Sequence, residues 1–213
     1  MVPTLSPDTL NLLSTADRDQ LLDIAVASIA HGLRKGKPME VRPDHYSAEL
    51  QRTGASFVTL RHRGELRGCM GCLETIAPLV RDVSHNAYSA AFHDPRFPPL
   101  TENLYPNLHV SISVLSPASR MECQSEEELL AQMRPGVDGV VLRIGTIQAT
   151  LLPAVWSHVD SPRDFLVHLK RKARLPDDFW SSELLFFRYT AESFAKMVAQ
   201  ARVITGEDAA EVP

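Results

Sequence analysis

The chain has 213 residues, of which 44% are hydrophobic and 23% are charged, and its formal net charge is −4. These values are typical of a globular protein that folds around its own core without disulfides. The acidic total argues against extensive nucleic-acid binding, so such a site would need a local basic patch. No apolar run reaches the roughly 18 residues of a membrane span, and the N-terminus lacks the basic and apolar regions of a signal peptide. The three cysteines are expected to be reduced thiols, which predicts a cytoplasmic protein.

The N-terminal region predicts one long helix after a loosely held tail. Ser14 or Thr15 can cap the helix, and apolar residues recur at helical spacing from Leu21 to Ile29. Glycines between Gly32 and Gly36 predict its end. Residues 37–50 are polar and contain two prolines, so they predict a loop with one short turn.

A β-hairpin is expected next. Residues 55–63 are rich in strand formers, and Gly64-Glu65 can close a tight turn. The stretch from Leu66 to Glu74 then forms the returning strand. Because side chains alternate along a strand, residues 67, 69, 71 and 73 are predicted to share one face, and residues 66, 68, 70, 72 and 74 the other.

The central region predicts a helix, a proline-rich loop and a strand. Pro78 suits the first turn of a helix, whose small apolar residues continue to Ala91. Residues 91–100 contain three prolines, which exclude a helix or a central strand. Residues 108–115 alternate between apolar and polar side chains and predict a strand.

The rest of the chain predicts further helices and strands. Ser125 and Glu128 have the spacing of a capping box at the start of a helix that continues to Met133. The other expected elements are a hairpin of residues 140–144 and 147–152, a helix at 161–174, a strand at 184–189 and a helix at 194–201.

The order of these elements predicts the fold class. Strands occur mostly as hairpins with helices between them, which indicates an α+β fold with a mainly antiparallel sheet flanked by helices. We expect one domain over residues 14–205, because no long linker divides it. Residues 1–13 and the acidic residues 206–213 are expected to be flexible tails.

One stretch of the chain combines reactive and permissive residues. Cys69 is the candidate nucleophile, and Arg67, two residues earlier, can lower the pKa of its thiol. Gly68 and Gly71 leave backbone N–H groups uncovered, which can bind a substrate or hold a developing oxyanion. The alternative is a structural cysteine on a packed strand, with the glycines present for close packing.

Other residues of the predicted site come from the following helix and loop. A general base would have to be supplied by Glu74, His85 or His93. Asp94, Arg96 and Phe97 could bind a substrate, or the charged pair could simply hold the proline-rich loop in place through charge-assisted hydrogen bonds.

A metal or redox role for the cysteines is less well supported. Cys69 and Cys72 form a C-x-x-C, but in a strand these two side chains point to opposite faces. The sequence has no G-x-G-x-x-G, Walker A or H-E-x-x-H motif. We therefore expect no cofactor and no metal, and a solvated surface rather than a phosphate track for the scattered arginines and lysines.

The same stretch carries a resemblance to a known family. Arg67-Gly68-Cys69-Met70-Gly71 resembles the R-G-C-[hydrophobic]-G hallmark of the AMMECR family, whose bacterial members are called AmmeMemoRadiSam system protein A. Further matching segments follow in order over residues 17–200: Leu73-Glu74, Asn86-Ala87 with Ala90-Ala91, Asp94 to Leu100, Ser113 to Ser116, Leu151-Leu152-Pro153, Phe165-Leu166 and Lys172-Ala173.

The resemblance implies an α+β fold with a larger and a smaller lobe, and a cleft around the hallmark strand. It implies a cytosolic enzyme, cysteine-dependent and either modifying or hydrolytic, in a macromolecule-modification pathway with Memo-like and radical SAM partners. A non-catalytic binding or adaptor module for a peptide, nucleotide or nucleic acid is the alternative, and the substrate stays open. Three differences stand out: this chain lacks the cysteine that many relatives have before Lys172-Ala173, Arg174 occupies a position where glycine is usual, and Cys72 is an extra cysteine inside the hallmark.

Overall fold

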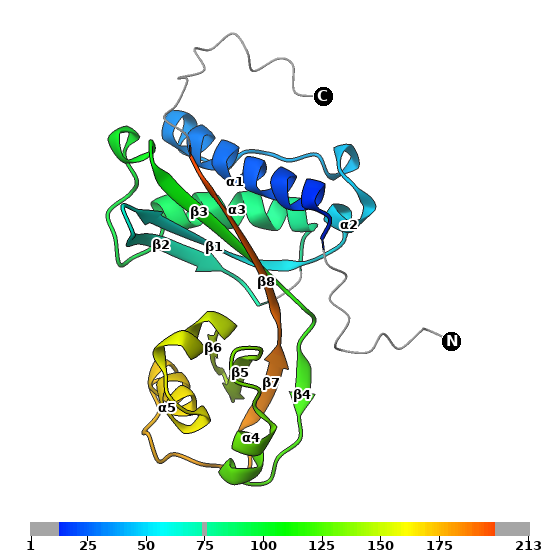
Figure 1. Cartoon of the computed structure of the whole chain (residues 1–213), viewed down its shortest axis with the longest axis vertical. Helices are drawn as coiled ribbons and strands as arrows, with labels where there is room; N and C mark the ends of the chain where they lie inside the picture. The colour runs from blue at the N-terminus through cyan, green and yellow to red at the C-terminus, as the bar shows by residue number, and fades with distance from the viewer. Residues whose placement is uncertain (1–12, 74–75, 199–213) are drawn as a thin grey trace. The chain divides into compact units, whose positions relative to one another are not determined.

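The computed structural model describes residues 13–73 and 76–198, and these form two compact units (Figure 1). The first unit contains residues 13–114 and 192–198, and the second unit contains residues 115–191. Each unit has its own antiparallel four-stranded sheet and its own helices, which confirms the predicted α+β class. No helix in the described ranges has both the length and the apolar character needed to cross a lipid bilayer.

The first unit is a helix layer on a sheet whose strand order is β2-β1-β3-β8. Helix α1 packs on α3, and α3 packs on β1 and β2, so the apolar core lies between the helices and one face of the sheet. We call the other face the open face. The elements are α1 (Thr15–Lys35), α2 (Ala48–Gln51), β1 (Ala55–His62), β2 (Glu65–Gly71), α3 (Leu79–Phe92), β3 (Leu108–Leu115) and β8 (Ala191–Met197).

Helix α1 begins and ends where its sequence predicts. The hydroxyl of Ser14 accepts a hydrogen bond from the backbone N–H of Asp17, and the Asp17 carboxylate accepts one from the Ser14 backbone in return. This reciprocal pairing satisfies N–H groups that have no partner within the helix. Gly36 ends the helix with a φ of 68°, a left-handed conformation that glycine adopts without a steric penalty.

A β-bulge in the β1–β2 hairpin corrects two predictions. The turn residues are Arg63 and Gly64, both with positive φ, because Glu65 is already paired with His62. Leu66 lies opposite Arg61 but Gly68 lies opposite Leu60, so Arg67 is an extra residue on β2. Strict alternation therefore fails here: Leu66 shares the open face with Cys69, because their partners Arg61 and Thr59 are two residues apart on β1.

The two hallmark glycines allow close approach of neighbouring backbone. A Cβ atom at Gly68 would lie 1.9 Å from the backbone carbonyl oxygen of Ala90 on α3, so any side chain at this position would push the helix away from the sheet. A Cβ atom at Gly71 would lie 2.4 Å from the carbonyl oxygen of Ser56 and also 2.4 Å from the Phe57 ring. Both glycines thus have a packing role.

The second unit has a sheet of order β4-β7-β5-β6, with α5 packed on β5 and β6. The Phe165 ring stacks on Trp156 at 4.2 Å between ring centroids, inside an apolar core. The buried Lys170 ammonium lies 2.7 Å from the Glu126 carboxylate, which compensates its charge. The elements are β4 (Ser119–Met121), α4 (Glu126–Gln132), β5 (Gly139–Ile144), β6 (Ile147–Leu151), α5 (Pro162–Lys172) and β7 (Leu185–Tyr189).

The C-terminal helix predicted at 194–201 is wrong over its described part, because β8 occupies Ala191–Met197. Alternate residues of β8 contact the helix layer: Glu192 pairs with Arg18 on α1, and Phe194 packs into the core. This two-residue period is that of a strand. Residues 199–201 lie outside the described residues. Strand β4 was not predicted, since three residues are too short to show a period.

The backbone at Arg174 explains why the family resemblance implies a glycine at this position. It follows α5 with a φ of 60°, in the left-handed region that favours glycine. The glycine usual at this position would relieve that strain.

A buried polar network joins α3 to β1. The Asp82 carboxylate accepts hydrogen bonds from the Ser56 hydroxyl at 2.6 Å and from the Asn86 amide at 2.9 Å. Burial nevertheless raises the pKa of Asp82 to about 6, although these hydrogen bonds and His85 favour the charged form. The folded protein therefore holds a proton that the unfolded chain releases at lower pH, so stability falls as the pH rises from about 4 to about 6.

We predict that Asp82→Asn removes this pH dependence. An amide oxygen can accept the same two hydrogen bonds without a buried charge, so the free energy of unfolding should rise by about 1–3 kcal/mol at pH 8 and change little at pH 4. Urea unfolding at both pH values measures it. Asp19→Asn, which changes an exposed carboxylate, is the control. A variant with the same stability difference at both pH values would contradict the assignment.

Candidate functional site

The candidate site lies at the edge of the sheet, along β2. Strand β2 has a neighbour on one side only, so some of its backbone groups lack a strand partner. The Asp94 carboxylate, in the loop after α3, accepts a hydrogen bond from the Cys69 backbone N–H at 2.8 Å. Arg96 Nη2 approaches the Cys69 carbonyl oxygen at 3.5 Å. The loop therefore covers the strand edge at the hallmark cysteine.

Asp94 and Arg96 hold each other in a fixed geometry. Arg96 donates from Nε to one carboxylate oxygen at 2.9 Å and from Nη2 to the other at 2.7 Å. The Asp94 side chain is only 2% exposed. Hydrogen bonds from Arg96 and from the Cys69 backbone hold the pKa of Asp94 well below its usual range, against the effect of burial. The pair stays ionised and fixes the proline-rich loop against β2.

The Cys69 side chain is half-buried on the open face. Its Sγ accepts a hydrogen bond at 3.2 Å from the hydroxyl of Thr59, its partner across the hairpin. Arg96 also interacts electrostatically with Cys69, although Asp94 is the main reason why the pKa of Arg96 is raised. A hydroxyl donor and a cation therefore lie beside the Cys69 sulfur.

Arg67, the bulge residue, belongs to a cluster with Asp94, Arg96 and Phe97, and unlike Arg96 it has no salt bridge in the described structure. Its Nε is buried without a hydrogen-bond partner in the described structure. Its guanidinium carbon lies 5.8 Å from the centroid of the Phe97 ring, and that of Arg96 lies 5.5 Å from the same centroid. The ring thus supports both cations. Because Asp94 compensates Arg96, the charges of these three ionised residues sum to +1.

The predicted proton carriers do not join this cluster through any described contact. His85 is exposed on α3 and interacts electrostatically with Asp82. His93 is exposed, and its ring meets the Tyr88 ring edge-on at 5.0 Å. Among the described residues, no hydrogen bond links either histidine to Cys69, and Glu74 lies outside them. Cys72 follows the end of β2 and is exposed.

The described residues also contain no group of three or more His, Cys, Asp or Glu side chains placed to hold a metal ion.

Comparison with known proteins assigns this chain to a protein family. The AMMECR1 family profile matches residues 22–194. The chain belongs to the AMMECR1 family. A protein of Methanothermobacter thermautotrophicus is 36% identical to it over 186 residues, covering 85% of this chain and 95% of the relative. A protein of Methanopyrus kandleri is 34% identical over 178 residues, covering 80% and 83%.

A solved structure agrees with the fold of this AMMECR1 protein. An uncharacterised protein from Pyrococcus horikoshii superimposes with a TM-score of 0.76 at 31% identity, covering 85% of this chain and 96% of that one. In this chain the family hallmark lies on a bulged edge strand, β2, which the Asp94–Arg96 loop covers.

Thr59 is the site residue that the sequence analysis missed. A regular two-residue hairpin at Arg63-Gly64 would place Gly68 opposite Thr59, whereas the bulge places Cys69 there. No local signal in the sequence predicts a bulge at Arg67, so the partner of the thiol could not be named from the hairpin alone.

We predict that Asp94→Ala exposes the strand edge at Cys69. Without the carboxylate, the Cys69 amide hydrogen should exchange with solvent at least about 10-fold faster, because an unprotected edge amide is open to water. Amide exchange followed by NMR at Cys69 measures this. Asp44→Ala, which removes an exposed carboxylate paired with Arg42, is the matched control, and an unchanged Cys69 exchange rate would contradict the role of Asp94.

Proposed function

We propose that this AMMECR1-family protein binds a phosphate or carboxylate group of its ligand through Arg67. The observation that carries the proposal is the buried Nε of Arg67, which has no hydrogen-bond partner in the described structure. A buried donor left unpaired costs about 1–3 kcal/mol. An anionic ligand at this guanidinium would remove that cost and compensate the charge.

The residues around Arg67 suit this role. Phe97 restrains both guanidinium groups, so less side-chain entropy is lost when a ligand binds. The side-chain contacts of Arg96 with Asp94 use Nε and Nη2, so Nη1 takes no part in that pairing. An arginine presents a planar fork of donors that matches the two oxygens of a carboxylate or phosphate. In this proposal Arg67 is the main anion receptor and Arg96 supports it.

We predict that Arg67→Ala weakens anion binding at this edge by about 10-fold or more, as expected for the loss of a charge-assisted hydrogen bond. Pyrophosphate and succinate are the probes. In the folded full chain, NMR titration should move the Arg67 Nε–H resonance and the Cys69 backbone amide together. Arg52→Ala, which removes an exposed arginine paired with Glu49, should leave the affinity unchanged. If neither probe moved the Arg67 resonance, the proposal would fail.

A second candidate function uses the thiol of Cys69. Cys69 Sγ lies on the open face, accepts a hydrogen bond from Thr59 and interacts electrostatically with Arg96. In this candidate the protein is a cysteine-dependent modification enzyme or hydrolase, and Cys69 is its nucleophile. Proton transfer by Glu74, His85 or His93, and backbone donation from Gly68 or Gly71, stay predictions.

We predict that Cys69 reacts with iodoacetamide at pH 7 about 10-fold faster than free cysteine, and that Thr59→Val removes most of this excess because the thiolate loses a donor. Mass spectrometry of the modified peptides separates Cys69 from Cys72 and Cys123. A Cys69 rate equal to that of free cysteine would exclude the enzymatic candidate. If Cys69→Ser cells kept full function while Arg67→Ala cells lost it, binding alone would be the function.

For the cellular context we propose what the family resemblance implies: a cytoplasmic pathway of macromolecule modification with Memo-like and radical SAM partners. Its test is co-purification of such partners with the tagged wild-type chain but not with Arg67→Ala.

A further inference from the structure

A separate pocket lies on the open face of the first unit, beside the tip of the β1–β2 hairpin. Its volume is about 400 Å³, within the range of sites for small organic ligands. It does not include Arg67, Cys69 or the Asp94–Arg96 loop. The lining residues are Arg61, Arg63, Gly64, Asn107, His109 and Met197.

The walls of this pocket are held in place by the backbone. Arg63 and Gly64 have φ values of 52° and 85°, the conformation of a tight hairpin turn. Arg61 donates from Nη1 to the Gly64 carbonyl oxygen at 3.0 Å, which fixes its long side chain along the strand. On the opposite wall, the Asn107 N–H donates to the Val198 carbonyl oxygen at 3.2 Å. The pocket is therefore preformed.

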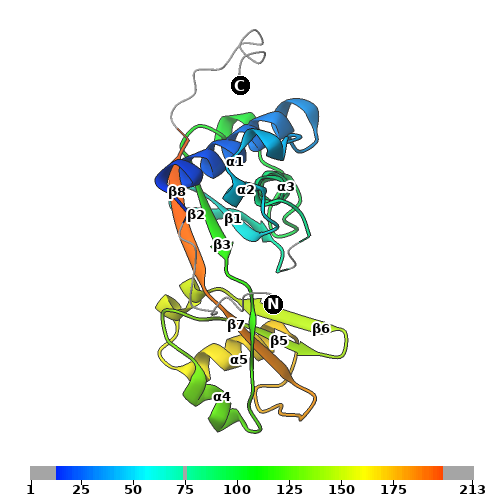
Figure 2. The ribbon, with the colours of Figure 1, turned by 90° about the vertical axis from the view of Figure 1, so that its right-hand side faces the viewer.

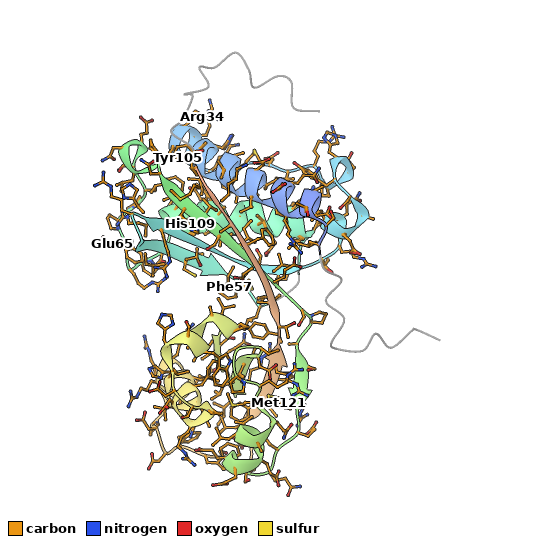
Figure 3. All side chains as sticks on the ribbon, viewed as in Figure 1. Arg34, Phe57, Glu65, Tyr105, His109 and Met121 are labelled. Atoms are coloured by element: carbon orange, nitrogen blue, oxygen red, sulfur yellow. The ribbon has the colours of Figure 1, made fainter. Side chains whose placement is uncertain are left out.

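The inner surface of the pocket is mainly apolar although its residues are mainly polar. The lining is therefore formed mostly by carbon and sulfur atoms of these residues, and their polar groups contribute little to it. The Met197 side chain is 54% exposed, an unusual position for a large apolar residue on a strand. Arginine and methionine side chains both form favourable contacts with flat aromatic rings. Figure 3 labels His109 on β3 and Glu65 at the hairpin.

The rim of the pocket is positively charged. Neither Arg61 nor Arg63 forms a salt bridge with any residue in the described part of the chain. The carboxylate nearest in the hairpin, Glu65, is paired in register with His62, the neighbour of Arg61, so it faces away from the open face. Two guanidinium groups thus border an apolar pocket without a carboxylate to compensate them.

We propose that this pocket binds a nucleoside monophosphate. The base would lie against Met197, His109 and the stem of Arg61, and the phosphate would be held at the rim by the guanidinium groups of Arg61 and Arg63. A ligand with a flat ring and an anionic group matches both the apolar lining and the two arginines at the rim. An apolar ligand would match only the lining, and an inorganic anion would match only the arginines.

Strands β1 and β2, which carry Arg61 of the pocket and the hallmark cysteine, are neighbours in the sheet of the first unit (Figure 2). Arg61 and Thr59, the partner of Cys69, are two residues apart on the same face of β1, a spacing of about 7 Å. A bound nucleotide therefore lies one side-chain row from the Cys69 thiol. The proposal rests on the pocket alone and does not need the anion site at Arg67.

The experiment is an NMR titration of the full chain with AMP, adenosine, inorganic phosphate and 4-nitrophenyl phosphate. AMP should shift the backbone amides of Gly64, His109 and Met197 and should bind at least about 10-fold more tightly than adenosine or phosphate, because each supplies only one of the two contacts. If 4-nitrophenyl phosphate bound as tightly as AMP, the nucleotide assignment would be overturned.

Two variants test the two contacts separately. Arg63→Asn keeps a residue that tolerates the left-handed turn and should lower AMP affinity about 10-fold without affecting adenosine. Met197→Ala should lower the affinity for both AMP and adenosine about 5-fold without affecting phosphate. The controls are Arg52→Ala and Ile76→Ala, which change an exposed arginine and an exposed apolar residue elsewhere.

Two results would overturn the proposal. One is the absence of AMP shifts at 5 mM, roughly the weak limit of ligand recognition. The other is a set of AMP shifts that centre on Arg67 and disappear in Arg67→Ala.

Discussion

The close approach of helix α3 to strand β2 is the constraint on which the rest of the site depends. It is possible only because residue 68 has no side chain, since a Cβ atom there would collide with the carbonyl oxygen of Ala90. The helix ends at Phe92, and the loop that follows is thereby delivered to the edge of β2. Asp94 can then reach the backbone N–H of Cys69. One glycine therefore connects helix packing, edge protection and the geometry of the hallmark strand.

The electrostatic arrangement follows from that geometry. The Asp94 carboxylate is buried and fully engaged by Arg96 and Cys69, so it stabilises the loop and is not available as a general base. Arg67 Nε has no hydrogen-bond partner among the described residues, and the Phe97 ring leaves the charge of Arg67 in place. A cluster with one compensated and one uncompensated arginine is better suited to binding an anion than to activating a thiol by charge alone. The hydrogen bond from the Thr59 hydroxyl to Cys69 Sγ is the contact that supports the second candidate, a reactive thiol.

Much of the fold could be predicted because its signals are local. Ser14 with Asp17, and Ser125 before α4, mark helix starts through hydrogen bonds within one turn, and the alternating residues of β3 mark a strand. The final strand was predicted as a helix because its residues carry no strong local preference. Only pairing with β3 and the burial of Phe194 against the helix layer impose the extended conformation.

The sequence by itself determined the membership of this chain in the AMMECR1 family, its α+β class and the residues that make up the hallmark, because periodicity, capping and motif spacing are properties of neighbouring residues. Tertiary structure alone decided that Cys69 lies opposite Thr59, that Asp94 covers the strand edge and that Arg67 Nε is buried without a hydrogen-bond partner in the part of the chain that the structure describes. The physical reason is the bulge at Arg67 together with the contact of Gly68 with Ala90. The contact of Gly68 with Ala90 joins segments that are distant in the chain, and the bulge leaves no signature in the local pattern.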